Sequence, residues 1–319
     1  MKRKFSKVLS LCISIFFIYL CLKDIPLKNL FKDIYFNLNL LIYGLILIFF
    51  VNIFKALRFK ILLSKYKKKN LNFYIKPALI RKFLNSTFFG NVGELAVPLI
   101  FKRYLKMTYI EGLSIVSIER LLDLSVISLF FGIGLYYIDF NFFNEIIILY
   151  FILYFSLILI FIFLINYKKK LFFFPKTYLE KFKIGYQMTI KDTRLFLKSI
   201  IITFFIWGMY IVIDLLLFKS FEITNPISSV PNIIFLTGVV LASQLIPAAP
   251  SSIGVFNFFV IQTIQKFYEV LNLEYNAQIE AGLTSISIIV LILYIIPDIT
   301  WGAYVFFKEA SLNLKNIKI

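Results

Sequence analysis

The chain has 319 residues, of which 60% are hydrophobic and 16% are charged, and 35 Lys and Arg against 17 Asp and Glu give a formal net charge of +18. Its mean hydropathy is +0.86, whereas a soluble domain has about 45–50% apolar and about 25% charged residues. These values exclude a disordered chain and argue against a soluble enzyme, which leaves an all-α polytopic membrane protein. The chain has no His, which excludes imidazole metal sites and histidine bases.

Six apolar runs are long enough to cross a bilayer, because a spanning helix needs about 17–25 residues. The first run follows a basic start and lacks a small-residue cleavage site, so we expect an uncleaved helix and not a signal peptide. The predicted spans are residues 5–22, 38–54, 112–138, 146–166, 199–218 and 282–306.

Two further apolar regions are interrupted internally. Region 83–101 is broken at 90–93 and again at Pro98, which leaves arms of about seven or eight residues that are too short to cross. Because basic residues flank both of its ends, we predict a re-entrant hairpin. Region 232–268 is broken between Pro247 and Gly254 and has arms of about 14–15 residues. These lengths are compatible both with a broken re-entrant hairpin and with two short spans.

The distribution of basic residues predicts the topology. With a cytoplasmic N-terminus, 29 Lys and Arg fall in cytoplasmic segments, 5 fall in outer segments, and Arg120 lies within a span. This asymmetry predicts six spans with both termini and a basic linker at 167–198 in the cytoplasm. We expect a single domain over residues 1–319 in the plasma membrane. The basic run at 67–69 is then a topology determinant, and no nucleic-acid partner is expected.

In this topology the two broken regions open from opposite faces of the membrane. A short similarity links them, since each is followed by a Gly-Leu-Ser/Thr segment, at Gly112 and at Gly282. Paired broken helices of opposite orientation are typical of inverted-repeat transporters, whose site lies between the repeats near the midplane. We therefore predict a polar cavity between the breaks, lined by Glu94 and the Arg120 face of its helix.

Charged residues inside membrane spans are costly and often functional. Glu119, Arg120 and Asp123 share one face of one helix, where Arg120 and Asp123 can neutralise each other and Glu119 adds a surplus negative charge. Glu94 follows the break at Gly93, so its carboxylate lies on the first turn of a half-helix. These residues predict a polar binding site; the alternative is that Arg120 and Asp123 form a structural pair between helices.

Asp214 and Asp298 are weaker candidates. Each lies near the end of a predicted span, and Asp298, which follows Pro297, is also suited to cap a half-helix.

Two motifs resemble a known family. The stretch FGNVGELAVPLIFKRYLKMTYIEGLSIVSIERLLDL resembles the GE…P…(E)R-L-x-D pattern of the flippase-like membrane domain of lysylphosphatidylglycerol synthases and their stand-alone relatives, and LIPAAPSSIGVFNFF resembles that family's P-x-x-P-x-x-x-G-x-F segment. The family's site positions then fall on Gly93, Glu94, Arg120, Asp123, Pro247, Pro250 and Gly254.

This resemblance implies a helical domain that moves a lipid between leaflets. The chain departs from the family in two respects. It stops soon after Lys308, without an aminoacyl-transferase domain, so we expect a stand-alone member that is not an enzyme. Many members carry an Arg soon after the Gly-Glu, whereas here residues 96–98 are Ala, Val and Pro, with Lys102 and Arg103 following.

The leading functional hypothesis is a flippase that moves a phospholipid or a lipid-linked headgroup, anionic or phosphate-bearing, through the polar cavity. No phosphate-binding loop is present, and no cofactor is expected. The alternative is a membrane-embedded transferase with a lipid-linked donor, in which Glu94, Glu119 and Asp123 hold a divalent cation or act as a base. A third hypothesis is a structural partner for another membrane protein. A homo-oligomer or a partner enzyme is compatible with each of these.

Overall fold

A computed structural model describes residues 2–23, 25–32, 34–66, 69–89, 91–137, 176–190, 192–243 and 249–317. These residues form helices, joined by short turns and one isolated bridge between Phe36 and Phe221. The helices are α1 (Lys2–Leu22), α2 (Leu38–Leu62), α3 (Leu71–Thr87), α4 (Val92–Leu105), α5 (Tyr109–Tyr137), α7 (Lys176–Ile190), α8 (Thr193–Lys219), α9 (Val230–Ser243), α10 (Val255–Val270) and α11 (Ala277–Ile317), with short 3₁₀ turns at Leu27–Asn29, Asn225–Ile227 and Pro250–Ser252. The predicted span 146–166 and Pro247 lie outside the described residues.

Within the described residues, three helices are long and apolar enough to cross a membrane, namely α2, α8 and the Ala277–Glu309 part of α11. They contain the predicted spans 38–54, 199–218 and 282–306. The 29 residues of α5 are also sufficient in length, but this helix carries three charged residues close together at 119, 120 and 123. The prediction of an all-helical polytopic membrane fold is confirmed.

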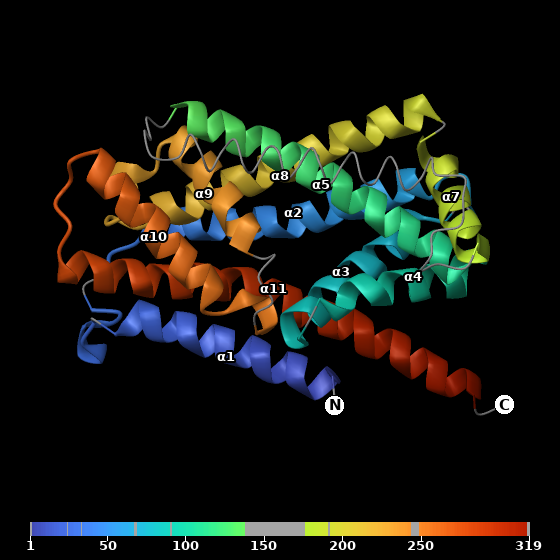
Figure 1. Cartoon of the computed structure of the whole chain (residues 1–319), viewed down its shortest axis with the longest axis horizontal. Helices are drawn as coiled ribbons and strands as arrows, with labels where there is room; N and C mark the ends of the chain where they lie inside the picture. Colours follow the sequence, from blue (N-terminus) through green and yellow to red (C-terminus); the bar gives the residue numbers. More distant parts are fainter. Residues whose placement is uncertain are drawn as a thin grey trace.

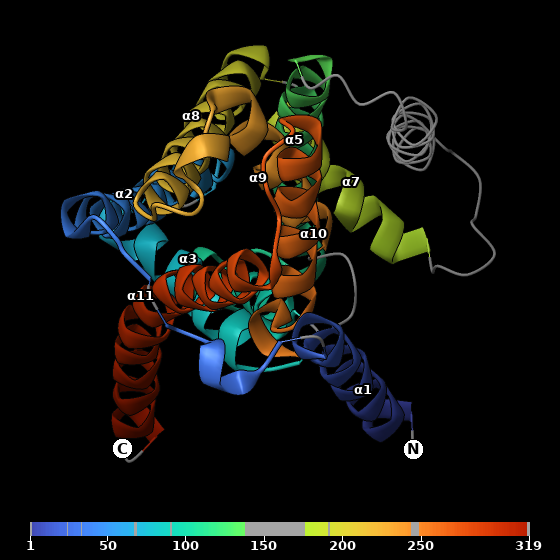
Figure 2. The same cartoon turned by 90° about the vertical axis from the view of Figure 1, so that its left-hand side faces the viewer.

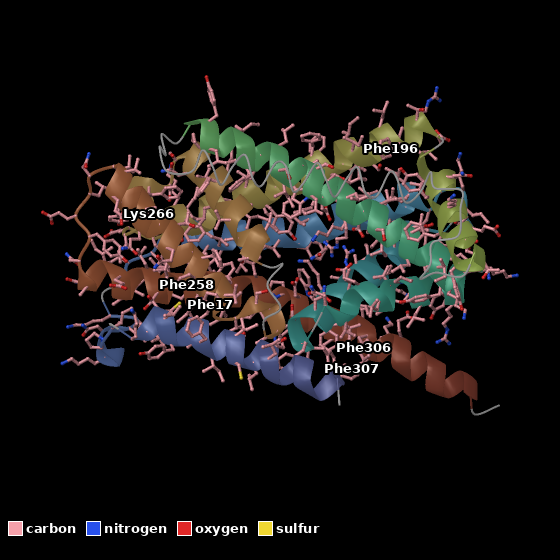
Figure 3. All side chains as sticks on the ribbon, in the orientation of Figure 1. Phe17, Phe196, Phe258, Lys266, Phe306 and Phe307 are labelled. Atoms are coloured by element: carbon pink, nitrogen blue, oxygen red, sulfur yellow. The ribbon has the colours of Figure 1, made fainter. Side chains whose placement is uncertain are left out.

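The helices pack as a bundle in which α2 and α8 lie side by side along most of their length (Figure 1). Its largest apolar core joins α2, α8, α9, α10 and α11 through fully buried side chains such as Ile48, Leu217, Ile264 and Leu283. Helix α1 lies at one edge of the bundle (Figure 2) and packs on α10, where the rings of Phe17 and Phe258 are 5.0 Å apart (Figure 3).

The segments that connect the helices gather at the two ends of the bundle. Helix α7 and the C-terminus lie at one end of the molecule, whereas the α1–α2 and α10–α11 connections lie at the other (Figure 1). This grouping matches the pairs of segments that the topology prediction places on the same side of the membrane. The predicted linker at 167–198 contains a helix, α7, which packs on α5. Which end faces the cytoplasm stays a prediction.

The first break is a helical hairpin with longer arms than predicted. Its arms are α3, with 17 residues, and α4, with 14 residues, and the chain turns between them at Asn91, which has a left-handed φ of 52°. The predicted bounds 83–101 and the short arms are therefore wrong. They exclude the basic residues before position 83, whereas Lys76, Arg81 and Lys82 also lie in α3, where carboxylates from other helices pair with them. Pro98 lies inside α4 without ending it.

The second break joins α9 to α10, whose 14 and 16 residues agree with the expected arm lengths. Ser251, Ser252 and Gly254 all have positive φ values, of 57°, 55° and 84°. The Ser251 hydroxyl donates to the backbone oxygen of Ser86, in the last turn of α3, at 3.5 Å. The two breaks of the chain thus lie side by side.

Helix α11 runs through Pro297 and bends near its middle (Figure 2). A proline inside a helix removes a backbone donor and crowds the preceding turn, which accounts for a bend of this kind. Asp298 therefore lies within a continuous helix, and its predicted role as the cap of a half-helix is wrong.

Candidate functional site: a buried network of ion pairs

Arg58 of α2 lies at the centre of the polar interior. One terminal nitrogen, Nη2, donates to Glu119 Oε1 at 2.5 Å, and the other, Nη1, donates to Asp123 Oδ1 at 2.5 Å. The side chains of Arg58 and Glu119 are completely buried, and that of Asp123 is 7% exposed. A single guanidinium from α2 thus holds both carboxylates of α5.

Arg81 of α3 completes the neutralisation of Glu119. Its Nη1 donates to Glu119 Oε2 at 2.5 Å and its Nη2 to Oε1 at 2.9 Å, which is the bidentate geometry that makes Arg–carboxylate pairs strong. The surplus negative charge expected at Glu119 is therefore compensated by two arginines. We call Arg58, Arg81, Glu119 and Asp123 the buried cluster.

Helix α8 closes the buried cluster on a third side. The indole Nε1 of Trp207 donates to Asp123 Oδ1 at 2.9 Å, and Arg58 Nη1 donates to the Thr203 hydroxyl at 3.2 Å. Buried charges in a membrane persist only when their hydrogen-bonding groups find partners. Contacts from α2, α3, α5 and α8 supply partners for both carboxylates and for both terminal nitrogens of Arg58, whereas its buried Nε has no hydrogen-bond partner among the described residues.

Arg120, beside this cluster, behaves differently. It pairs with Glu94 at the start of α4 through Nη2 and, at 3.2 Å, through Nε, while its Nη1 lies 3.5 Å from Asp123. Its side chain is 44% exposed and that of Glu94 is 21% exposed. The alternative of a self-contained Arg120–Asp123 pair is thus wrong, because Asp123 is held by Arg58 and Trp207 and Arg120 by Glu94. We call Arg120 and Glu94 the exposed pair.

Gly93 brings the exposed pair against the buried cluster. A Cβ atom at Gly93 would overlap the backbone oxygen of Arg81, so only glycine permits this approach of α4 to α3. The Gly93 amide donates to Asn85 Oδ1 at 2.8 Å, and Asn85 Nδ2 donates to Glu94 Oε1 at 3.3 Å. As a result Glu94 Oε2 lies 3.8 Å from Arg81 Nη1, and the six charged groups form one network.

The two weaker candidates, Asp214 and Asp298, make separate polar contacts. Asp214 is buried and accepts hydrogen bonds from the Thr237 hydroxyl at 2.7 Å and from the Tyr294 hydroxyl at 2.6 Å. Asp298 accepts from Lys82 of α3 at 2.7 Å.

The other described positions among the predicted site residues lie at the end of α4 and in the second break. Lys102 and Arg103 are exposed in the last turn of α4. Pro250 and Gly254 lie in the second break, and a Cβ atom at Gly254 would meet the backbone of Ser14 in α1.

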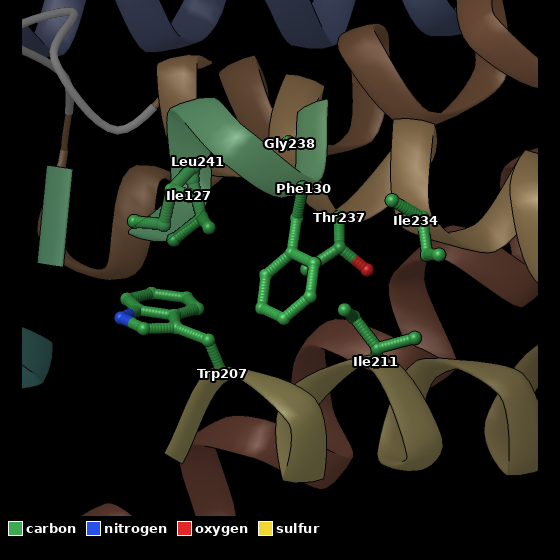
Figure 4. A pocket seen from close by; sticks show the side chains of 8 residues that line it. All are labelled: Ile127, Phe130, Trp207, Ile211, Ile234, Thr237, Gly238 and Leu241. Carbon is green, nitrogen blue, oxygen red and sulfur yellow. The ribbon is translucent and has the colours of Figure 1, made fainter. Parts of the chain in front are cut away.

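A small pocket lies between α5, α8 and α9 (Figure 4). Its lining is apolar apart from the Thr237 hydroxyl and the Trp207 indole nitrogen, and none of the charged candidates lines it. The lining residues are Ile127, Phe130, Trp207, Ile211, Ile234, Thr237, Gly238 and Leu241. Across the described part of the chain, no group of three or more His, Cys, Asp or Glu is placed to hold a metal ion.

Arg58 and Arg81 are not predicted from the sequence. The predicted span ends at residue 54 and the predicted hairpin begins at residue 83, so both arginines fall among the predicted cytoplasmic bases. The local sequence gives no clear signal, because Arg58 lies between Lys55 and Lys60 in a segment with three bases in six residues.

The fold and this network define a polytopic helical membrane protein with ion pairs in its interior. The chain belongs to the family described as the lysylphosphatidylglycerol synthase TM region, which matches residues 7–268. Comparison with curated proteins and with solved structures gives no significant match. Family membership confirms the resemblance carried by the two motifs and indicates a lipid-related function in the membrane.

Proposed function

We propose that the protein is a lipid flippase and that the exposed pair binds the headgroup of an anionic or phosphate-bearing phospholipid. The observation that supports this proposal is the 44% exposure of the Arg120 side chain. Arg120 lies eleven residues after the start of α5 at Tyr109, about 16 Å along the helix axis. An arginine exposed so far inside a spanning helix is costly in hydrocarbon unless a polar group or water reaches it.

The chemistry of the exposed pair suits a phosphate. The planar guanidinium of Arg120 binds Glu94 through two nitrogens, and phosphate oxygens accept hydrogen bonds from arginine in the same bidentate way. Glu94 lies in the first turn of α4, where unpaired backbone N–H groups and the helix dipole favour an anion. A headgroup phosphate would therefore replace the Glu94 carboxylate at Arg120, while the buried cluster keeps the surrounding helices in place.

The experiment is lipid movement by the purified chain in vesicles. Vesicles of phosphatidylcholine carry a trace of acyl-labelled fluorescent phosphatidylglycerol, and the fraction that an impermeant quencher reaches reports movement between leaflets. We expect movement with the wild-type chain and a loss of about tenfold or more with Arg120→Gln, the equivalent of one charged hydrogen bond. Arg194→Gln is the control, since Arg194 is an exposed arginine in the first turn of α8.

Two outcomes would contradict the proposal. One is a wild-type chain that leaves the labelled lipid in its original leaflet, and the other is an Arg120→Gln variant that moves lipid at the wild-type rate. Mass spectrometry of the same vesicles tests the alternative of a transferase, because a transferase with a lipid-linked donor changes the mass of a lipid and a flippase does not.

A further inference from the structure

Asp214 has an environment unlike those of the other buried acidic residues. Glu119 and Asp123 are paired with arginines, and Asp298 is paired with Lys82. Within the described residues, Asp214 has no ion-pair partner; its oxygens accept from two hydroxyl groups, Thr237 of α9 and Tyr294 of α11.

Hydroxyl partners suit a carboxyl group that changes its protonation state. Arginine and lysine only donate, so they stabilise the carboxylate alone. A hydroxyl group both donates and accepts, and it can bond a carboxylate as well as a protonated carboxyl by rotating its hydrogen. The pair formed by Thr237 and Tyr294 therefore satisfies Asp214 in either state without any movement of the helices.

The titratable groups around Asp214 lie between this residue and the buried cluster. On its own helix, Tyr210 lies one turn earlier, with its ring 6.4 Å from that of Tyr294, and Tyr210 accepts a hydrogen bond from Lys55 of α2 at 2.8 Å. Lys82 of α3 lies beyond Tyr210 and is engaged by Asp298 of α11. Arg81, the neighbour of Lys82 in α3, belongs to the buried cluster.

Among the residues that the structure describes, the other helices bring no further charge to Asp214. Helix α9 has no titratable residue. The nearest acid that α5 presents to α8 is Asp123, which binds Trp207, two helical turns before Asp214. On α10, Lys266 pairs with Glu269 and the Tyr268 hydroxyl donates to the backbone oxygen of Ile223. Helix α7 packs on α5 and on α8, which it precedes in the chain.

The net charge of the network formed by the buried cluster and the exposed pair suggests a role for Asp214. Three arginines, at 58, 81 and 120, face three carboxylates, at 94, 119 and 123, so the network is neutral before a lipid binds. A monoanionic headgroup adds one negative charge inside the membrane, where an uncompensated charge is costly. One proton taken up in the same bundle offsets that charge.

We propose that Asp214 is the proton-binding residue that couples phospholipid movement to a proton gradient. This inference rests on the proposed flippase function. On one side of the membrane a proton binds an Asp214 carboxylate oxygen and a monoanionic headgroup binds at Arg120; on the other side both leave. No covalent bond of the lipid changes, and one proton with one monoanion moves no net charge, so a pH difference drives the transfer and a membrane potential does not.

The test uses vesicles that contain the purified chain and a trace of acyl-labelled phosphatidylglycerol, with an imposed pH difference. A difference of one pH unit is a tenfold difference in proton activity, so one-to-one coupling shifts the ratio of labelled lipid between leaflets by about tenfold at equilibrium. That ratio does not depend on the orientation of the protein in the vesicle. We expect this shift in the wild-type chain and in Asp192→Asn, a partly exposed acid at the start of α8. In Asp214→Asn we expect an even distribution.

Two further measurements keep the proposal testable if Asp214→Asn does not fold. Asp214→Glu keeps a carboxyl group and should keep the shift, and a pH-sensitive dye inside wild-type vesicles should report proton entry when labelled lipid is supplied on one side. A wild-type chain that moves lipid with no shift and no proton entry would overturn the coupling and leave the flippase intact. A shift that persists in folded Asp214→Asn would also overturn it. A wild-type chain that moves no lipid would overturn the flippase proposal itself and the coupling with it.

Discussion

The buried cluster and the exposed pair both consist of arginine–carboxylate contacts and both include residues of α5, but their surroundings differ. Glu119 lies between two arginines with no exposed surface, whereas Arg120, the next residue, is 44% exposed and is shared between Glu94 and Asp123. A buried ion pair that is broken leaves an uncompensated charge, whereas an exposed pair contributes little to stability. We infer that the buried cluster holds the helices together and that the exposed pair is available to a ligand.

The largest effect is expected from breaking the buried cluster. Arg58→Met should lower the free energy of unfolding by about 3–5 kcal/mol, because it removes the shared partner of Glu119 and Asp123 and leaves a buried charge uncompensated. Thermal unfolding of the purified chain in detergent would measure this loss. Lys60→Met, at an exposed position of the same helix, is the control. Equal stability of Arg58→Met and the wild-type chain would show that the cluster is not structural.

The next largest loss of stability is expected where Gly93 brings the exposed pair against the buried cluster. Gly93→Ala should cost about 1–3 kcal/mol, because the added methyl group overlaps the backbone of Arg81 and pushes α4 away from α3. The matched control is Gly208→Ala in α8, where a Cβ atom has nothing within 4 Å. The difference between the two unfolding temperatures is the measurement. If both variants melt together, α4 does not depend on this close approach.

A smaller effect on stability is expected at the exposed pair. Arg120→Gln should change the free energy of unfolding by less than about 1 kcal/mol, since the pair is partly exposed. The same variant should lose lipid movement in the vesicle assay, so that stability and function separate at this residue. A large loss of stability in Arg120→Gln would instead place Arg120 with the buried cluster.

The smallest effect lies outside the membrane, at Asp192. Its carboxylate accepts the backbone N–H of Leu195 and pairs with Lys65 at 3.2 Å, and these contacts lower the pKa of Asp192. A lowered pKa in the folded state gives stability that is present above the unfolded pKa of about 3.9 and is lost as the pH falls through the folded value. We expect Asp192→Asn, which keeps a capping side chain, to reduce the loss of thermal stability below about pH 4. An identical pH profile for both chains would contradict this.

The sequence predicted the helical membrane fold, the two breaks and the carboxylates of the site, because each leaves a local pattern. Apolar length identifies α2, α8 and α11, and the Gly-Glu after the break identifies Glu94. The partners of these carboxylates were not predicted. Arg58 and Arg81 are separated from Glu119 by 61 and 38 residues, and a basic residue near a span end has the same pattern whether it is solvated or paired. Only the packing of α2 and α3 against α5 distinguishes the two cases.

The separation between Arg58 and its partners also has a consequence for biosynthesis. Arg58 leaves the ribosome before Glu119, and at about 5–20 residues per second the 61 intervening residues take about 3–12 s to be made. During that interval the guanidinium has no carboxylate from α5, and an unpaired arginine is expensive within the hydrocarbon. The C-terminal part of α2 and the α3–α4 hairpin are therefore expected to stay at the membrane surface until α5 emerges. Their entry into the bilayer would then be a single joint event, timed by the synthesis of α5.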